Sequence, residues 1–122
     1  GSAGFDLSAI EQTEIGPGET RLVKTGLAVA VPEGYELQVR PRSGTSLKTG
    51  LRVANAPGTV DSDYRGEVCV IMTNTGDETY YINQGDRIAQ GVICPVFQVE
   101  FEETDILDDT KRGSGGFGST GL

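Results

Sequence analysis

The segment best suited to chemistry is the glycine-rich end of the chain, residues 112–122. Five of its eleven residues are glycine, which loses the most backbone entropy on ordering, so the segment cannot build a core. Glycines let backbone N–H groups approach an anion, Arg112 adds a planar cation, and Ser119 and Thr120 add hydroxyls. Phe117 offers a ring on which a base can stack. These residues predict a mobile lid over a nucleotide, and a disordered tail is the alternative.

The charge balance limits the partners that the chain can bind. Ten Lys and Arg residues stand against 18 Asp and Glu residues, which gives a formal net charge of −8. Binding to a nucleic-acid polymer relies on many Lys and Arg contacts to phosphate, so this charge argues against such a partner. The chain has no histidine, so carboxylates must supply any general base or metal ligand. The charge is still compatible with a small phosphorylated substrate that is held by a few arginines and a divalent cation.

Four other segments are too polar and too rich in glycine to serve only as strand connections. They combine carboxylate, arginine, hydroxyl or amide groups with glycine or proline, and they are residues 3–7, 41–44, 55–66 and 85–90. Taken singly, each has an ordinary structural explanation, such as a turn carboxylate for Asp61 or a surface cation for Arg42. Five such segments in order within 122 residues, the C-terminal one included, favour a single assembled site.

Short strands separated by turns make up the rest of the sequence and would position these segments. Apolar, β-branched runs with turns about every ten residues are typical of a β-sandwich or barrel. Strands are expected at residues 21–31, 35–40, 66–73, 79–82 and 88–101, with turns near residues 84–86 and Pro95 and one helical turn at residues 46–50.

The length of the chain predicts a single domain. We expect an all-β catalytic core over residues 1–106, followed by a linker and a lid arm over residues 107–122. Cys69 and Cys94 lie in apolar runs, so we expect buried free thiols and a cytoplasmic or other reducing intracellular compartment. We expect neither a membrane span nor a signal peptide, because no apolar run has the required length or position.

Together the five segments resemble the five ordered motifs of the trimeric deoxyuridine triphosphatase (dUTPase) family. They read AGFDLSA, PRSG, NAPGTVDSDYRGEV, GDRIAQ and RGSGGFGSTG, and they span residues 3–121. The resemblance implies a jelly-roll-like β-barrel or sandwich and a homotrimer whose active sites are shared between subunits. It also implies Mg²⁺-dependent hydrolysis of dUTP to dUMP and pyrophosphate, by in-line attack of water on the α-phosphate. Such a reaction limits uracil incorporation into DNA and supplies dUMP.

The resemblance assigns roles to five residues of the first and third motifs. Asp61 matches the catalytic carboxylate that deprotonates the attacking water. Asn55 and Gly58 match a hairpin that reads the uracil edge. Tyr64 matches the ring that packs under the deoxyribose and leaves no room for a 2′-hydroxyl. Asp6 matches an acid that holds a metal-bound water while Mg²⁺ sits on the three phosphates.

The other three motifs resemble the phosphate-binding elements of the family. Arg112 matches a contact to the γ-phosphate, and Phe117 matches the ring that stacks on uracil. The remaining matched phosphate contacts are Arg42, Ser43, Gly44, Gln90, Gly118, Ser119 and Thr120, with Arg87 in the same motif as Gln90.

Several nearby polar residues are expected to have structural roles instead. Asp63 is interpreted as structural, Asp86 as a turn carboxylate, and Tyr80 and Tyr81 as strand residues. For Arg65 and Arg87, a salt bridge at a subunit interface is as good an interpretation as a contact to substrate.

The chain departs from the family pattern in three places. Thr45 and Ser46 replace the more usual Leu and Ala, which makes the start of the short helix more polar. Gly91 replaces a larger apolar residue, so looser local packing is expected. The strand that usually precedes the first motif is expected to be absent or trimmed, which would leave one edge of a sheet less fully closed.

Two other functions compete with dUTP hydrolysis. A deoxycytidine triphosphate deaminase looks similar in fold and in its PRSG-like segment, but it leaves the resemblance of residues 112–121 unexplained. The second alternative is a regulatory or binding protein that keeps the scaffold and acts through nucleotide-dependent contacts with a partner. The products formed from each nucleotide discriminate among the three.

Overall fold

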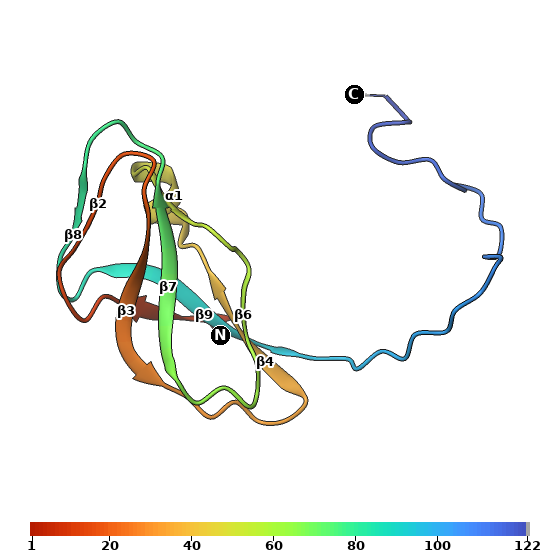
Figure 1. The fold of residues 1–122 in the computed structure, drawn as a ribbon, viewed down its shortest axis with the longest axis horizontal. Helices are drawn as coiled ribbons and strands as arrows, with labels where there is room; N and C mark the ends of the chain where they lie inside the picture. Colours follow the sequence, from red (N-terminus) through yellow and green to blue (C-terminus); the bar gives the residue numbers. More distant parts are fainter. Residues whose placement is uncertain (122) are drawn as a thin grey trace.

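The computed structural model describes residues 1–121 and shows a small β-sandwich with one short helix and an extended C-terminal segment (Figure 1). Apolar and β-branched residues dominate the strands, as expected for pleated and half-buried surfaces. In chain order the elements are β1 (Gly4–Ser8), β2 (Thr13–Ile15), β3 (Thr20–Ala28), β4 (Tyr35–Arg40), α1 (Ser43–Lys48), β5 (Leu51–Val53), β6 (Gly58–Val60), β7 (Glu67–Asn74), β8 (Tyr80–Ile82) and β9 (Arg87–Pro95).

The strands form three antiparallel sheets. The largest has the strand order β1-β9-β4-β6, the second has the order β3-β7-β5, and β2 pairs with β8. Because β9 lies between β1 and β4, Gln90 stands opposite Asp6 on one side and Arg40 on the other. This register brings three of the five motifs to one end of the largest sheet.

β7 shows how the sequence builds the core. Val68, Val70, Met72 and Asn74 are buried, and the residues between them are only half-buried, as the two-residue period of a strand requires. The apolar members of this row belong to one cluster with side chains of the largest sheet, such as Leu37. The prediction of an all-β sandwich is confirmed.

Predictions from the sequence are accurate for β4, β7 and β8. The strand at residues 35–40 is confirmed as β4, and those at residues 66–73 and 79–82 are confirmed to within one residue as β7 and β8. β9 ends at Pro95, where a turn was expected, and no strand follows it within the described residues. The continuation of the strand to residue 101 is therefore wrong, although the apolar alternation persists there.

Short elements escaped the sequence analysis. β2, β5 and β6 have three residues each, too few for a two-residue period to be recognised, whereas the equally short β8 consists only of the strand-favouring residues Tyr and Ile. α1 begins at Ser43, three residues before the predicted helical turn, and it has no buried residue. The polar Thr45 and Ser46 therefore replace no core side chain.

Gly91 does not loosen the packing, contrary to the expectation from its missing side chain. It lies opposite Phe5 in the pairing of β1 with β9, and the Phe5 ring occupies the space above it. A Cβ at Gly91 would lie 2.5 Å from Phe5 Cζ and 2.9 Å from Leu37 Cδ1. An aromatic ring across from a strand glycine thus fills the gap.

Beyond β9 the chain leads away from the sandwich (Figure 1). Phe97, Phe101 and Phe117 are almost fully exposed, at 86%, 93% and 114% of their reference areas. Leu122, the last residue of the predicted lid arm, lies outside the described residues. No helix in residues 1–121 is both long and apolar enough to cross a membrane.

Candidate active site

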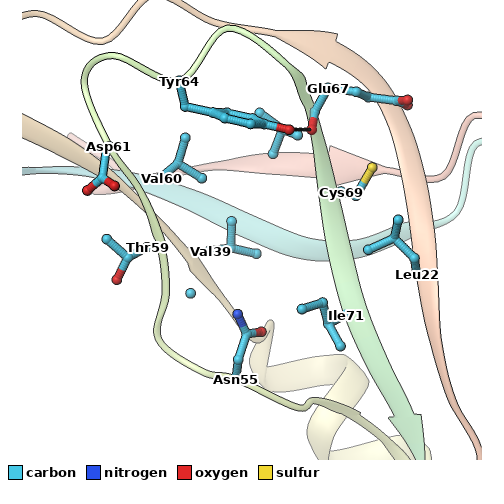
Figure 2. A pocket seen from close by; sticks show the side chains of 12 residues that line it. Leu22, Val39, Asn55, Thr59, Val60, Asp61, Tyr64, Glu67, Cys69 and Ile71 are labelled. Atoms are coloured by element: carbon cyan, nitrogen blue, oxygen red, sulfur yellow. Dashed lines mark hydrogen bonds between the residues drawn. The ribbon is translucent and has the colours of Figure 1, made fainter.

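An open cleft of about 320 Å³ lies between the β6 segment and the outer face of β7 (Figure 2). Asn55 comes from the β5–β6 connection, Gly58 from β6, and Asp61 and Tyr64 from the β6–β7 loop. The structure therefore brings together four of the five residues that were predicted to contact the nucleoside or the attacking water, and the fifth, Phe117, lies on the arm. A cavity of this size with a few polar groups suits a small organic ligand.

One side of the cleft is bounded by β6, which pairs with β4. Gly58 stands opposite Val39 in this pairing. A Cβ at Gly58 would lie 3.2 Å from Val39 Cβ and 3.3 Å from Asn55 Nδ2. The missing side chain lets the Asn55 amide approach the strand, so a polar group and backbone atoms share one edge of the cleft.

Asp61 follows β6 directly and is exposed to solvent. The Tyr64 backbone N–H donates to the Asp61 carbonyl over 3.1 Å, which closes a turn. Arg65 stabilises the same turn, because its guanidinium donates to the carbonyls of Ser62 (2.7 Å) and Tyr64 (3.1 Å). Within this chain, Arg65 therefore supports the loop that carries Asp61.

The floor of the cleft is apolar, and the sequence analysis missed it. Leu22, Cys69 and Ile71 line it from the outer face of the β3–β7 sheet. Burial raises the pKa of the Cys69 thiol, the Glu67 carboxylate adds to the increase, and Lys24 opposes it. The alternation along residues 67–73 could have placed Cys69 and Ile71 on one face, but it could not have shown that this face borders the β6 segment.

A second group of predicted residues meets at the end of the largest sheet. The Arg42 Nε lies 3.0 Å from Asp6 Oδ1, and an Arg87 guanidinium nitrogen lies 3.7 Å from Asp6 Oδ2. One carboxylate therefore holds two arginines that would otherwise repel each other. The carboxylate partner of Arg87 within this chain is thus Asp6.

Gln90 connects the strands that carry this group. Its Nε2 donates to the Pro41 carbonyl over 2.9 Å, next to Arg42. A Cβ at Gly4 would collide with the Gln90 side-chain oxygen, so the small residue in β1 leaves room for the amide. Gln90 thus holds the PRSG turn against the sheet.

The two groups of residues are not in one hollow of this chain. Arg42 and Arg87 border a separate polar hollow of about 320 Å³, to which α1 contributes Thr45. This hollow shares no lining residue with the cleft. Ser43 and Gly44 form the exposed first turn of α1.

The arm residues lie apart from both hollows. Arg112, Phe117, Gly118, Ser119 and Thr120 line a hollow that the arm forms by itself. Figure 1 shows the arm leading away from the sandwich. The structure of one chain thus leaves the five motifs in three places.

Several structural interpretations from the sequence are confirmed. The Asp86 carboxylate accepts a hydrogen bond from the Asn83 backbone N–H over 2.8 Å, as expected of a turn acid. Tyr80 and Tyr81 belong to β8. Asp63 lies beside a surface hollow rather than in the cleft, and its structural role stays a prediction.

The charged residues fit a metal ion that is bound mainly through the phosphates of a ligand. Within residues 1–121, no three acidic, cysteine or histidine side chains come together as a metal site would require. Asp6 is a single, half-exposed carboxylate beside two arginines. Mg²⁺ is commonly bound through one or two carboxylates plus substrate phosphates, and Asp6 fits that pattern.

Comparison with known proteins agrees with the motif resemblance. The sequence model of the dUTPase family matches residues 1–121. A deoxyuridine 5′-triphosphate nucleotidohydrolase from Wolinella succinogenes is 60% identical over 121 residues, which cover 99% of this chain and 81% of that protein. A homologue of the same name from Caulobacter vibrioides is 56% identical over 126 residues and is covered to 81%.

Solved structures show the same fold. A mutant dUTPase of Staphylococcus bacteriophage 80alpha with dUpNHpp superposes with a TM-score of 0.91 at 30% identity, over 99% of this chain and 87% of that one. A mutant dUTPase from phage phi11 of S. aureus, described with a structural Mg(II) ion, has a TM-score of 0.81 at 28% identity, over 88% of this chain and 86% of that one.

Proposed function

The chain belongs to the dUTPase family, and we propose that it hydrolyses dUTP to dUMP and pyrophosphate at a site built around the cleft. One observation carries the proposal: Asn55, Asp61 and Tyr64 line the same hollow of about 320 Å³. An amide, a carboxylate and an aromatic ring in one small cleft are the groups needed to read a base, activate water and pack against a sugar. The homologues that carry the name of this activity support it.

Asp61 acts as the general base. Its carboxylate is exposed, so water can reach it, and the chain offers no histidine for this role. Asp61 takes a proton from the water, whose oxygen forms a bond to the α-phosphorus. The bond from the α-phosphorus to the bridging oxygen breaks on the opposite side, and pyrophosphate leaves with that oxygen.

The cleft selects the nucleoside. Leu22 and Ile71 provide an apolar floor for a base, and the Asn55 amide lies at its edge. Because Gly58 keeps β6 close to β4, the hairpin leaves little width beside the uracil edge. A 5-methyl group would collide there, and a cytosine amino group would lack its partner. Tyr64 packs under the deoxyribose and excludes a 2′-hydroxyl.

The triphosphate binds at the arginine cluster. Arg42 and Arg87 supply positive charge in a chain of net charge −8, and Ser43 and Gly44 add a hydroxyl and accessible backbone beside them. Gln90 positions Arg42 through the Pro41 carbonyl and keeps a second amide hydrogen for a phosphate oxygen. Asp6 would hold Mg²⁺ through a water; when bound, the ion neutralises charge on the phosphates.

A homotrimer completes the site. The cleft, the arginine cluster and the arm occupy three places on one chain, so neighbouring copies would have to supply the missing groups. The apolar side chains of Phe97, Val99 and Phe101 alternate along the segment after β9 and are each more than 70% exposed. Packing of this segment on a neighbouring subunit would cover these side chains. Residues 1–106 would then form the catalytic core, and residues 107–122 would form the arm.

The arm closes over the bound nucleotide. Phe117 stacks on the uracil, and Arg112, Gly118, Ser119 and Thr120 contact the phosphates. Ordering the arm costs roughly 1–2 kcal/mol per residue, whereas stacking returns about 1–3 kcal/mol per base. Closure therefore needs the additional phosphate contacts, so the arm closes over the triphosphate and loosens after cleavage.

We also propose a cytoplasmic or other reducing intracellular location. Cys69 in β7 and Cys94 in β9 are free thiols. Free thiols persist where glutathione and thioredoxin keep them reduced.

The test compares the wild-type protein with Asp61→Asn, and with Asp63→Asn as a matched control outside the cleft. Each protein is mixed with Mg²⁺ and, separately, with dUTP, dCTP, dTTP and UTP, and pyrophosphate, inorganic phosphate and ammonia are measured. Wild type should release pyrophosphate from dUTP alone. Asp61→Asn should lower that rate by at least about 100-fold, the usual contribution of a general base, and Asp63→Asn should not.

Other product patterns would point to the competing functions. Ammonia from dCTP would identify a deaminase. No product from any nucleotide, from a folded trimer, would identify a binding or regulatory protein. Equal activity of Asp61→Asn and wild type would contradict the assignment of the base while leaving the reaction itself intact.

A further inference from the structure

Tyr64 is held at the mouth of the cleft by contacts with its own chain (Figure 2). Its hydroxyl donates to the Glu67 carbonyl oxygen over 2.8 Å. To reach this acceptor, the ring must lie across the residue between the turn and β7, which is Gly66. The position of the ring therefore depends on how much space residue 66 leaves.

Gly66 leaves that space because it has no side chain. A Cβ at this position would lie 2.6 Å from Tyr64 Cζ and 3.0 Å from Tyr64 Cε1, and closer still to the hydroxyl oxygen. These separations are well inside ordinary van der Waals contact, which begins near 3.4 Å. The φ of Gly66 is not in the left-handed region, so its own backbone does not require glycine. The ring of Tyr64 is what a larger residue would displace.

The surrounding backbone is held independently of this contact. Arg65 donates to the Ser62 and Tyr64 carbonyls on one side of Gly66. On the other side Glu67 pairs with Ala28 in β3, and its carboxylate accepts a hydrogen bond from the Gly26 backbone N–H over 2.8 Å. A methyl group at position 66 would therefore displace the ring, which is the free end of a side chain, before it displaced the loop.

We propose that Gly66 is a specificity-determining residue for the sugar, because it sets the place of the Tyr64 ring at the cleft. This inference rests on the proposed function, in which the ring excludes a 2′-hydroxyl. Whether a ring excludes one hydroxyl depends on small shifts of the ring. The contact that places the ring therefore controls the discrimination between deoxyribose and ribose. Gly66 acts through Tyr64 and is a positioning residue.

The experiment measures sugar discrimination by binding as well as by turnover. Dissociation constants for dUMP and UMP are measured by calorimetry, and kcat/KM is measured for dUTP and UTP. The proteins are wild type, Gly66→Ala, Tyr64→Phe, Tyr64→Leu and the control Gly16→Ala. Gly16 lies outside both hollows, and the nearest atom to an added Cβ there is 3.7 Å away.

Gly66→Ala should reduce the preference for the deoxy sugar by about tenfold or more, the range expected when one steric contact in a pocket is changed. Tyr64→Phe keeps the ring above Gly66 and loses only the hydroxyl contact, so its preference should fall less. Gly16→Ala should keep the wild-type ratio. Thermal unfolding followed by circular dichroism shows whether each variant is folded.

An unchanged ratio in folded Gly66→Ala would overturn the proposal, whatever its absolute activity. If Gly66→Ala does not fold, Tyr64→Leu, which removes the ring, decides: a lowered ratio supports control by the ring, and an unchanged ratio overturns the proposal. Failure of the proposed function looks different, because wild type would then release no pyrophosphate from dUTP. The dUMP and UMP binding ratio still tests the role of Gly66 in that case.

Discussion

Adding one methyl group at Gly91 should destabilise the protein by about 2 kcal/mol, within the range for overpacking a filled core. The new Cβ would lie 2.5 Å from Phe5 Cζ and 2.9 Å from both Phe5 Cε2 and Leu37 Cδ1. Leu37 is 1% exposed and belongs to the core cluster, so it has no room to move. Phe5 is 42% exposed and can tilt outward, which limits the cost but removes part of its burial.

A double-mutant cycle assigns this cost to the aromatic ring. In Phe5→Ala the space above Gly91 is open, so Gly91→Ala should cost at least about 1 kcal/mol less there than in wild type. The remaining cost comes from the Leu37 contact. Urea unfolding, followed by far-UV circular dichroism at one protein concentration, measures all four proteins.

Gly16→Ala is the control for the effect of a methyl group on a glycine outside the core, because an added Cβ has room there. It should change the free energy of unfolding by less than about 0.5 kcal/mol. Equal costs of Gly91→Ala in the wild-type and Phe5→Ala backgrounds would refute the reasoning. Such additivity would mean that the Phe5 ring does not fill the space that Gly91 leaves.

Two other changes test a buried amide and the C-terminal arm. Asn74→Ala removes hydrogen bonds from Asn74 to the Ile15 (2.9 Å) and Glu78 (2.7 Å) carbonyls and from the Gly76 N–H (2.9 Å). At about 1 kcal/mol each, it should lower the free energy of unfolding in urea by about 3 kcal/mol, and a loss below 1 kcal/mol would contradict this. Deleting residues 112–122 should lower dUTP turnover by more than about 100-fold without changing the urea midpoint, since the arm leads away from the sandwich. Full turnover by the truncated protein would contradict the lid.

The longer elements were predictable from the sequence because their signals are local. β4 and β7 carry their two-residue alternation within one stretch of chain, so their existence and buried faces could be inferred without the fold. The same holds for the Asp86 turn, which is closed by groups three residues apart. The error after Pro95 has the opposite cause: residues 96–101 alternate like a strand, but no strand within residues 1–121 pairs with them.

The nucleoside residues could also be predicted, because one short segment supplies them. Asn55, Gly58, Asp61 and Tyr64 lie within ten residues, and the turn between β6 and β7 is enough to gather them around one cleft. Its apolar floor could not be predicted, because Leu22 reaches it only through the pairing of β3 with β7.

By itself, the sequence determined the strand-rich fold, the order of the five motifs and the chemical type of each candidate residue, since these depend on residue identity and on spacing along the chain. Only the tertiary structure decided that Asp6 holds both Arg42 and Arg87, and that Gln90 holds the Pro41 turn. The physical reason is strand register: β9 lies between β1 and β4, so residues from distant parts of the chain become neighbours. No local pattern encodes a contact that depends on two separate pairings at once.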